Sequence, residues 1–445
     1  MTHTLEQLRS GQLAGCTRLD LACGLTEFPA EIFTLTDTLE VLNLSGNRLS
    51  WLPDDLPRLH KLRVLFCSDN LFSEVPAVLG RCPAMQMIGF KANRIRQLPA
   101  AALPDGLRWL ILTDNQLECL PDALGECREL QKLMLAGNRL RELPASLAQC
   151  HKLELLRIAA NRLTDLPHWL LNLPRLAWLA FAGNPLCAQD EALGLAEHPP
   201  ARIDWPQLTG GQLLGEGASG VIRQALWQTA DGNSRPVAVK LFKGAVTSDG
   251  LPGCEMNACI AAGRHPNLIG LLGQLEGHPQ ATPGLVLELI DAGFSTLANP
   301  PSLESCTRDL YPADCRFSLA QVLGIAGGIA SACAHLHAQA INHGDLYGHN
   351  ILHHSTGACL LGDFGAASLY GRQSAGTATA LEQIEVRAFA CLLEELLERC
   401  EGCPATLERL SALQKTCGQP EPGRRPLFAT ISATLEQFRP LTESA

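Results

Sequence analysis

The sequence predicts an α/β solenoid built from short repeats, followed by an α+β domain with two lobes. Three observations lead to this prediction. An asparagine returns at nearly constant intervals from Asn47 onward, a glycine-rich segment begins at Gly215, and polar clusters that include two aspartates follow from Asp345 onward. The chain of 445 residues is also too long for one ordinary hydrophobic core, so more than one domain is expected.

The composition predicts a globular protein. Hydrophobic residues make up 46% of the chain and charged residues 18%, which is far from the range of disordered proteins. The formal net charge of -10 disfavours nucleic acid as a partner, because nucleic-acid-binding surfaces are usually basic. The 18 cysteines are scattered, and we expect reduced thiols within the cores. Cys400 and Cys403 form a CxxC pair, but no second pair of metal ligands lies near it in the sequence.

No segment of the sequence predicts a membrane span. The first residues, Met1 to Cys16, lack a basic stretch followed by an apolar run, so no secretory signal is expected. The most apolar segment, about Leu323 to Ile341, contains His335 and is interpreted as a buried helix. We therefore expect a cytoplasmic protein.

The asparagines recur at intervals of 23 residues, with a single interval of 22. They are Asn47, Asn70, Asn93, Asn115, Asn138, Asn161 and Asn184. Each follows a leucine-rich phrase such as Leu39–Leu49, and a Leu-Pro or Val-Pro pair follows most of them. The pattern resembles the leucine-rich repeat, LxxLxLxxNxL. It implies a repeat domain over residues 1–188 with about eight repeats of about 23 residues.

Elementary physics supports this resemblance. Leu42 and Leu44 alternate with polar residues, as in a short strand with one buried face, and an asparagine at the bend can satisfy backbone groups there. A single unit cannot bury its own leucines, so the units must stack. The end units should differ from the others, and Gly183–Cys187 is such an atypical closing unit.

The strand positions between the buried leucines should face the concave side of the solenoid. Several of them are apolar: Val64, Phe66, Met87, Trp109, Ile111, Met134 and Trp178. Such side chains could pack against one another along the sheet. Large apolar side chains on an exposed face more often bind a protein, and we predict a protein partner or substrate on this face.

After a linker assigned to residues 189–205, a second domain is expected over 206–440. It opens with Gly215, Gly217 and Gly220, which are followed by Val221. Glycines allow a backbone to close over phosphates. The trailing valine and the strand Pro236–Lys240 make this segment resemble the start of a protein kinase domain. The resemblance implies that the three glycines, Val221 and Lys240 bind ATP.

Two further segments resemble the small lobe of the kinase family. Glu255 lies on an expected helix ten residues before His265, a spacing similar to that of the glutamate that fixes the ATP-binding lysine. The apolar strand Leu285–Ile290 resembles the hinge segment, so backbone groups after Leu287, beginning with Glu288, are expected to bind adenine.

The strongest resemblance lies in His343–Leu352 and in Asp363-Phe364-Gly365. Asn350 follows Asp345 by 5 residues and Asp363 follows it by 18, both spacings typical of kinases. The resemblance implies that Asp345 accepts or orients the proton of the substrate hydroxyl. It also implies that Asn350 and Asp363 bind Mg, which prefers oxygen ligands. Downstream, Glu382 and Arg425 resemble a paired glutamate and arginine of the family, and Glu385 an acidic residue that supports the catalytic loop.

The chain departs from the family at two positions of the catalytic loop. Gly344 stands where most kinases carry the arginine that meets a phosphorylated activation loop, so activation should not depend on that phosphate. Tyr347 stands where serine/threonine kinases carry a lysine. The stretch from Asp363 to Glu382 is also short, at 19 residues.

These observations predict an ATP- and Mg-dependent protein kinase, most simply of serine or threonine, with a repeat domain that recognises a partner or substrate. Two alternatives remain at this point. The His-Gly-Asp-Leu phrase also resembles aminoglycoside and choline kinases, which phosphorylate small alcohols. A pseudokinase scaffold, whose repeats do the work, is the other alternative, although the retention of every phosphate and metal ligand argues against it.

Overall fold

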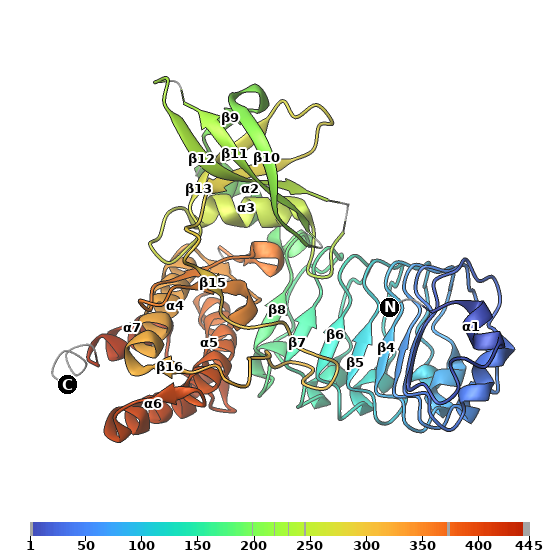
Figure 1. Ribbon diagram of the computed structural model, residues 1–445. Coiled ribbons are helices and arrows are strands. Elements are labelled where there is room, and N and C mark those ends of the chain that lie inside the picture. Colours follow the sequence, from blue (N-terminus) through green and yellow to red (C-terminus); the bar gives the residue numbers. More distant parts are fainter. Residues whose placement is uncertain are drawn as a thin grey trace. The chain divides into compact units, whose positions relative to one another are not determined.

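The computed structural model describes residues 3–438 except 198, 218, 230, 244–245 and 372–373, with backbone alone at 195–197. The chain divides into two compact units, residues 1–176 and 177–445. Each unit is described by itself below (Figure 1).

The first unit is a solenoid of parallel three-residue strands, coloured blue to teal in Figure 1. The strands are β1 (Arg18–Asp20), β2 (Val41–Asn43), β3 (Val64–Phe66), β4 (Met87–Gly89), β5 (Trp109–Ile111), β6 (Lys132–Met134) and β7 (Leu155–Arg157). Each pairs with the next in the same register, so that Val41 lies beside Val64, which lies beside Met87. The middle residue of each strand is a buried apolar side chain, as the alternating pattern predicts.

Short 3-10 helices lie between the strands, and most of them begin directly after a proline of the repeat. They are η1 (Ala30–Leu35), η2 (Leu56–Arg58), η3 (Ala77–Arg81), η4 (Ala100–Ala102), η5 (Asp122–Glu126), η6 (Ala145–Gln149) and η7 (Leu170–Asn172). The N-terminal helix α1 (Leu5–Arg9) has a capping box at Thr4. Proline fits the first turn because it has no N–H to leave without a partner.

The repeating asparagines connect neighbouring units, as the sequence predicts. The Asn138 amide donates to the carbonyl oxygens of Leu112 and Leu135 at 2.8 and 2.9 Å, and its oxygen accepts from the Leu117 N–H at 3.0 Å. Each asparagine thereby satisfies backbone groups of its own turn and of the preceding repeat. The residue before each asparagine has a positive φ, even at Ala160, where φ is 53°.

The second unit begins within the last repeat, and secondary structure fills much of the range expected to be a linker. Strand β8 (Trp178–Ala180) and the turn η8 (Pro185–Cys187) belong to this unit. Helix α2 (Ala188–Glu197) follows directly, and strand β9 (Arg202–Asp204) then pairs in parallel with β13 (Leu271–Glu276). Helix α2 from its second residue and all of β9 lie within residues 189–205 and are part of the fold.

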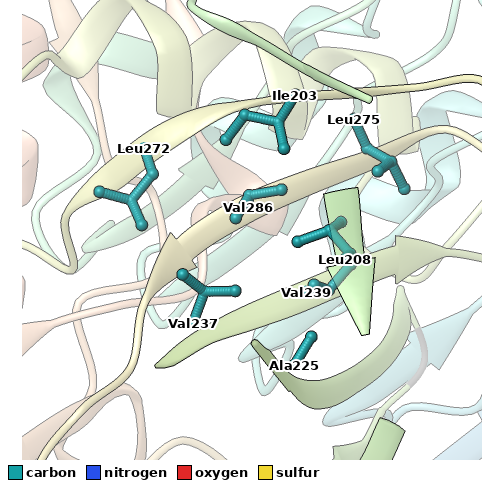
Figure 2. Close-up of a cluster of buried hydrophobic side chains, with 8 residues drawn as sticks. All are labelled: Ile203, Leu208, Ala225, Val237, Val239, Leu272, Leu275 and Val286. Carbon is teal, nitrogen blue, oxygen red and sulfur yellow. The ribbon is translucent and has the colours of Figure 1, made fainter. Parts of the chain in front are cut away.

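The small lobe is a six-stranded sheet with the order β10-β11-β12-β14-β13-β9. Its further strands are β10 (Leu208–Glu216), β11 (Gly220–Gln228), β12 (Ser234–Phe242) and β14 (Gly284–Glu288), and helix α3 (Pro252–Ala262) accompanies the sheet. Figure 2 shows the apolar side chains that gather between these strands, among them Val237 and Val286, which are fully buried. Ile203 of β9 belongs to the same cluster, so the added strand contributes to the core of the lobe.

The large lobe is mainly helical, orange to red in Figure 1. Its helices are α4 (Leu319–Ala338), α5 (Ala375–Leu397), α6 (Pro404–Cys417) and α7 (Phe428–Glu436). The short strands of this lobe are β15 (Ser295–Thr296), β16 (Phe317–Ser318), β17 (Ile341–Asn342), β18 (Ile351–His353), β19 (Cys359–Leu361), β20 (Ser368–Leu369) and β21 (Cys400–Glu401), and the catalytic segments lie between β17 and β20. Helix α4 is long and apolar enough to cross a membrane, but 61% of its most apolar window is buried, as expected for a core helix.

All the cysteines are free thiols, as expected. Many are buried core residues, and burial raises the pKa of the Cys82 thiol to about 11 and that of Cys127 to about 12. Within the part of the chain that the structure describes, no group of three or more His, Cys, Asp or Glu side chains could hold a metal ion, and the Cys400–Cys403 pair is no exception.

Candidate active site

The glycine-rich segment forms the hairpin between β10 and β11. Glu216 pairs with Val221, and the Gly217 N–H donates to the Gly220 carbonyl at 2.9 Å. A side chain at Gly220 would lie 2.5 Å from the Leu241 carbonyl oxygen, so the close approach of β11 and β12 requires glycine there. Glycine at this position lets the backbone of the hairpin approach closely, as phosphate binding requires.

Ile222, and not Val221, faces the nucleotide side of this hairpin. Ile222 pairs with Lys240 across β11 and β12 and lines the same cavity, whereas Val221 pairs with Leu241. Successive residues of a strand point to opposite faces. The cavity is therefore lined by the residue after the predicted Val221, and the family spacing of a valine two residues after the third glycine also points to Ile222.

Lys240 and Glu255 form a buried ion pair between β12 and α3, as predicted. Their side chains are 12% and 2% exposed. Burial opposes a charge on Lys240, but the negative charges of Glu255 and Asp363 outweigh it, so the pKa of Lys240 is raised. The lysine therefore remains a cation in the cleft.

A cavity of about 150 Å³ contains the predicted Lys240 and Glu255 of the small lobe together with Asp363. It is lined by Ile222, Lys240, Glu255, Cys259, Ala262, Gly263, Leu268, Ile269, Leu271, Leu285, Leu287, Gly362, Asp363 and Phe364. Lys240 and Asp363 are 123 positions apart in the chain (363 - 240) but face one space. This cavity brings together Lys240, Glu255 and Asp363, whereas Asp345, Asn350 and the three glycines are not among the residues that line it.

The hinge follows β14 as expected. Leu287 lines the cavity, and the Glu288 N–H donates to the Gly270 carbonyl at 2.8 Å. The Glu288 carboxylate contacts Arg235 at 3.1 Å, so the side chain points away from the cavity and only its backbone could meet an adenine ring. A second cavity of about 450 Å³ includes Glu288 and Asp291 in its lining.

The catalytic loop holds Asp345 and Asn350 together. The Asn350 amide donates to the Asp345 carboxylate at 2.7 Å and to its carbonyl oxygen at 2.9 Å. These bonds use the nitrogen of Asn350 and direct its amide oxygen elsewhere. Asp345 itself is half-buried.

Glu385 of α5 holds this loop by hydrogen bonds to its backbone, as predicted. Its carboxylate accepts from the backbone N–H groups of His343 at 3.3 Å and Gly344 at 2.7 Å, and His337 lies 2.7 Å from it. Burial acts against the carboxylate charge, yet the hydrogen bond from His337 and the neighbouring groups lower the pKa of Glu385 below its usual value. A charged anchor thus fixes the loop backbone.

Asp363 is placed next to Asn350 by the β18–β19 hairpin. The Gly362 N–H donates to the Asn350 carbonyl at 3.0 Å, and Asp363 follows in the left-handed conformation with φ 53°. Its carboxylate accepts from the Gly365 N–H at 3.1 Å and is otherwise exposed toward the cleft. The Asp363 carboxylate and the Asn350 amide oxygen are the kind of ligands that suit Mg, which takes oxygen ligands.

At the base of the large lobe, the predicted contact between Glu382 and Arg425 takes another form. The Glu382 carboxylate accepts from the Phe428 N–H at 2.7 Å. The Arg425 guanidinium donates to the carbonyl oxygens of Gln383 and Gln419 at 2.9 and 2.8 Å. The two segments are still connected, but through main-chain groups that a residue motif cannot reveal.

Sequence reasoning missed an acidic cluster beside the catalytic loop. Asp309 is buried, lies 2.7 Å from the His349 ring and accepts from the His349 N–H at 3.0 Å. Nearby, Tyr311 donates to Glu395 at 3.1 Å, and burial with the charge of Asp309 raises the pKa of Glu395 to about 7. Asp309 and Tyr311 lie in a segment without repeat or motif, so no sequence signal identified them.

The predicted partner face is smaller than expected. Val64 and Met87 are each 2% exposed and Trp178 is 1% exposed, so these three cannot contact a partner. Val64 lies in register between Val41 and Met87, and side chains in such a row cover one another. Phe66, Trp109, Ile111 and Met134 are half-buried.

Trp178 packs against the catalytic loop. Its ring stacks on Tyr347 with a centroid distance of 4.2 Å and an interplanar angle of 6°. Its Nε1–H donates to the Leu346 carbonyl oxygen at 3.0 Å. The repeat pattern predicted the position of this tryptophan but not the surface that covers it.

Comparison with known families agrees with this geometry. The profile of the protein tyrosine and serine/threonine kinase family matches residues 208–391. Leucine-rich-repeat profiles match residues 128–186 and 38–59. The chain therefore contains leucine-rich repeats and a protein kinase domain.

Curated relatives match parts of the chain. "Probable serine/threonine-protein kinase gdt4" of Dictyostelium discoideum is 29% identical over 160 residues, which are 36% of this chain and 9% of that protein. Cyclin-dependent kinase 10 of Homo sapiens is 26% identical over 241 residues, 49% of this chain and 62% of that protein. The transforming growth factor beta activator LRRC32 of Mus musculus is 33% identical over 124 residues, 26% of this chain and 19% of that protein.

The chain thus spans between 9% and 62% of the length of these relatives. Among solved structures, a leucine-rich-repeat protein of Leptospira interrogans is 26% identical, covers 42% of this chain and 48% of its own, and has a TM-score of 0.38.

Proposed function

We propose, on the premise that this chain joins leucine-rich repeats to a protein kinase domain, that it transfers the γ-phosphoryl group of ATP to a serine or threonine hydroxyl of a protein. The observation that supports this most directly is the single cavity that contains Lys240, Glu255 and Asp363. A scaffold without catalysis would have no need for a buried Lys–Glu pair, because burying two charges costs free energy that a hydrophobic pair would not.

The residues of the site divide the work of the reaction. Lys240, held as a cation by Glu255, would bind the α- and β-phosphates, while the backbone of the Gly215–Gly220 hairpin would close over them. Asp345 would orient the substrate hydroxyl and accept its proton as the hydroxyl oxygen bonds to the γ-phosphorus and the bond from that phosphorus to the departing ADP breaks. Asn350 and Asp363 would hold Mg, which neutralises charge on the phosphates when it is bound.

The preference for serine or threonine rests on the relatives, two of which are named as a serine/threonine-protein kinase and a cyclin-dependent kinase. We place the protein in the cytoplasm, because the eighteen free thiols suit a reducing compartment.

The test is transfer from radiolabelled ATP with Mg and a generic basic protein as acceptor. The Asp363→Ala variant should lose at least about 100-fold in kcat, since it removes a metal ligand. Asp165→Ala, an exposed carboxylate of the solenoid, is the matched control and should keep full activity.

Other outcomes overturn the proposal in defined ways. Label on an aminoglycoside or on choline, with none on protein, would assign the chain to the small-alcohol kinases. If the folded wild-type chain transferred no phosphate to any acceptor, the pseudokinase scaffold would be the remaining interpretation.

We further propose that the repeats bind a protein through Phe66, Trp109, Ile111 and Met134. The Trp109 indole N–H meets the Met134 sulfur at 3.4 Å, and Lys132 lies 4.5 Å from the ring centroid, so the tryptophan is held in one orientation. Preorganised aromatic side chains are the usual anchors of interfaces. Trp109→Ala should reduce capture of the bound protein in a pull-down about tenfold, whereas Trp51→Ala, outside the strand rows, should not; equal capture by both variants would refute this surface.

A further inference from the structure

The last repeat contributes more than a cap, because its strand β8 lies against the catalytic loop inside the second unit. The Trp178 ring covers Tyr347, and its Nε1–H bonds to Leu346, the residue directly after the catalytic Asp345. Stacked aromatic rings and a buried hydrogen bond each stabilise a single geometry. The side chain therefore restrains the loop within two residues of the group that accepts the proton.

Main-chain groups of the same repeat hold two further catalytic segments. The Leu179 carbonyl accepts from the Asn342 amide at 2.8 Å, just before the loop begins. The Phe181 and Ala182 N–H groups both donate to Ser368 Oγ at 3.0 Å. Ser368 lies in β20, which follows the Asp363 turn, so both sides of the active site are attached to this repeat.

Gly344 shows that the repeat takes the space where the family carries an arginine. Its φ is 73°, and a Cβ there would lie 2.6 Å from the Leu179 carbonyl oxygen and 2.7 Å from that of Ala366. No side chain fits at either distance. The loss of the arginine is therefore matched by the presence of the β8 backbone at the same place.

Helix α2, which continues from the repeat, packs on the helix that carries Glu255. A Cβ at Gly194 would lie 3.5 Å from the Cβ of Ala261 in α3 and 2.8 Å from the Leu369 side chain in β20. The Glu191 carboxylate accepts from the Gly183 N–H at 2.8 Å and so ties α2 back to the repeat. One continuous segment, 178–197, thus contacts the catalytic loop, β20 and α3.

We propose that residues 178–197 are a built-in activation element that replaces a phosphorylated activation loop, with Trp178 as the positioning residue of the catalytic loop. The proposal rests on the proposed function above. In a kinase with the arginine, a phosphate on the activation loop would draw these segments together. Here the segment that continues from the last repeat holds the catalytic loop, β20 and α3 together. The kinase is therefore active without phosphorylation, and turnover requires the repeat.

The experiment compares Trp178→Ala and Trp178→Phe with the wild-type full chain. Trp178→Ala should lower kcat at least about tenfold while KM for ATP changes less than about twofold, because Trp178 contacts Leu346 and Tyr347 of the catalytic loop, whereas Lys240 and the glycine-rich hairpin lie in the other lobe. Trp178→Phe keeps a ring on Tyr347 but loses the hydrogen bond to Leu346. Its kcat should therefore lie between that of Trp178→Ala and that of the wild type. Trp51→Ala, at 52% exposure, is the matched control.

Two readouts separate this proposal from the proposed function. Hydrogen exchange at the amides of residues 343–347 needs no catalysis and should accelerate in Trp178→Ala but not in Trp51→Ala. Phosphatase treatment of the wild-type chain should leave kcat unchanged. An active wild type with unaltered exchange and kcat in a folded Trp178→Ala overturns the inference, as does loss of activity after phosphatase; an inactive wild type overturns only the function.

Discussion

Trp109 and Trp178 occupy the same position of two repeats, each six residues before its asparagine. Trp109 remains half-buried among Met134 and Lys132, whereas Trp178 is 1% exposed and stacks on Tyr347. Equal repeat positions thus have unequal surroundings. Repetition determines where a strand residue lies, but the segments packed on it determine what it does.

The same contrast extends to the two units as a whole. In the solenoid, regular asparagine and leucine positions satisfy the backbone and the core. Both units also bury charges: Lys132, Glu154 and Arg157 in the solenoid, and the carboxylates Glu255, Asp309, Glu385 and Glu395 in the catalytic unit. Those of the catalytic unit include the groups that hold Lys240 and the catalytic loop in place, and burying a charge is tolerated where such partners are present.

The largest expected effect comes from crowding at Gly344. Gly344→Ala places a methyl group against two carbonyl oxygens at a positive φ, and we expect a loss of at least about 3 kcal/mol in unfolding free energy, with loss of turnover. Gly46→Ala in a repeat turn has a similar φ of 74° but only Ala22 at 3.8 Å, and should cost about 1 kcal/mol. Urea denaturation of both variants measures the difference, and similar costs would mean that the two turns are equally tolerant.

A smaller effect is expected where a repeat loses its asparagine. Asn138→Ala removes the partners of two carbonyl oxygens and one N–H in the solenoid interior, which should cost about 3 kcal/mol or slightly less. The exposed Asn172 bonds to the His168 carbonyl at 2.9 Å, and Asn172→Ala should change stability by less than about 0.5 kcal/mol. Thermal unfolding measures both variants, and equal melting temperatures of Asn138→Ala and Asn172→Ala would contradict this role of the asparagine.

The buried carboxyl of the catalytic unit predicts a pH-dependent effect. Because the folded state raises the pKa of Glu395 from 4.5 to about 7, it favours the protonated form, and stability falls as pH rises from 4.5 to 7. Glu395→Gln should therefore stabilise the protein at pH 8 by about 2 kcal/mol and change little at pH 4.5. The exposed neighbour Glu394→Gln is the control, and a gain that is the same at both pH values would show that burial of charge is not its origin.

The smallest effect is expected in a repeat turn that tolerates strain. Ala160 has a φ of 53°, which costs a residue with a Cβ about 1 kcal/mol or more. Ala160→Gly should raise the unfolding free energy by up to about 1 kcal/mol, since the relief exceeds the extra entropy of glycine in the unfolded chain. Ala145→Gly, at the start of η6, should instead lower it; denaturant midpoints that move the same way in both variants would contradict the turn geometry.

Local spacing was enough to predict much of the molecule. The asparagine interval placed the strands of the solenoid, and the motifs identified Lys240, Glu255, Asp345, Asn350 and Asp363, because each is defined by neighbours within a few residues. The structure brings Lys240, Glu255 and Asp363 to one cavity, and joins Asn350 to Asp345.

What the sequence did not reveal depends on contacts between distant segments. Asp309 meets His349 across 40 positions of chain. Trp178 and Tyr347 are 169 positions apart (347 - 178). No periodicity relates such pairs, so only packing can show them.

Strand β9 also affects how the chain could be shortened. It is the outermost strand of the small-lobe sheet, hydrogen-bonded to β13, and Ile203 fills part of the core. A fragment that started at residue 206, where the family resemblance begins, would strip this strand away and leave β13 as a bare edge ready to pair with another molecule. Such a fragment should aggregate in solution. A soluble catalytic fragment would have to begin before β8.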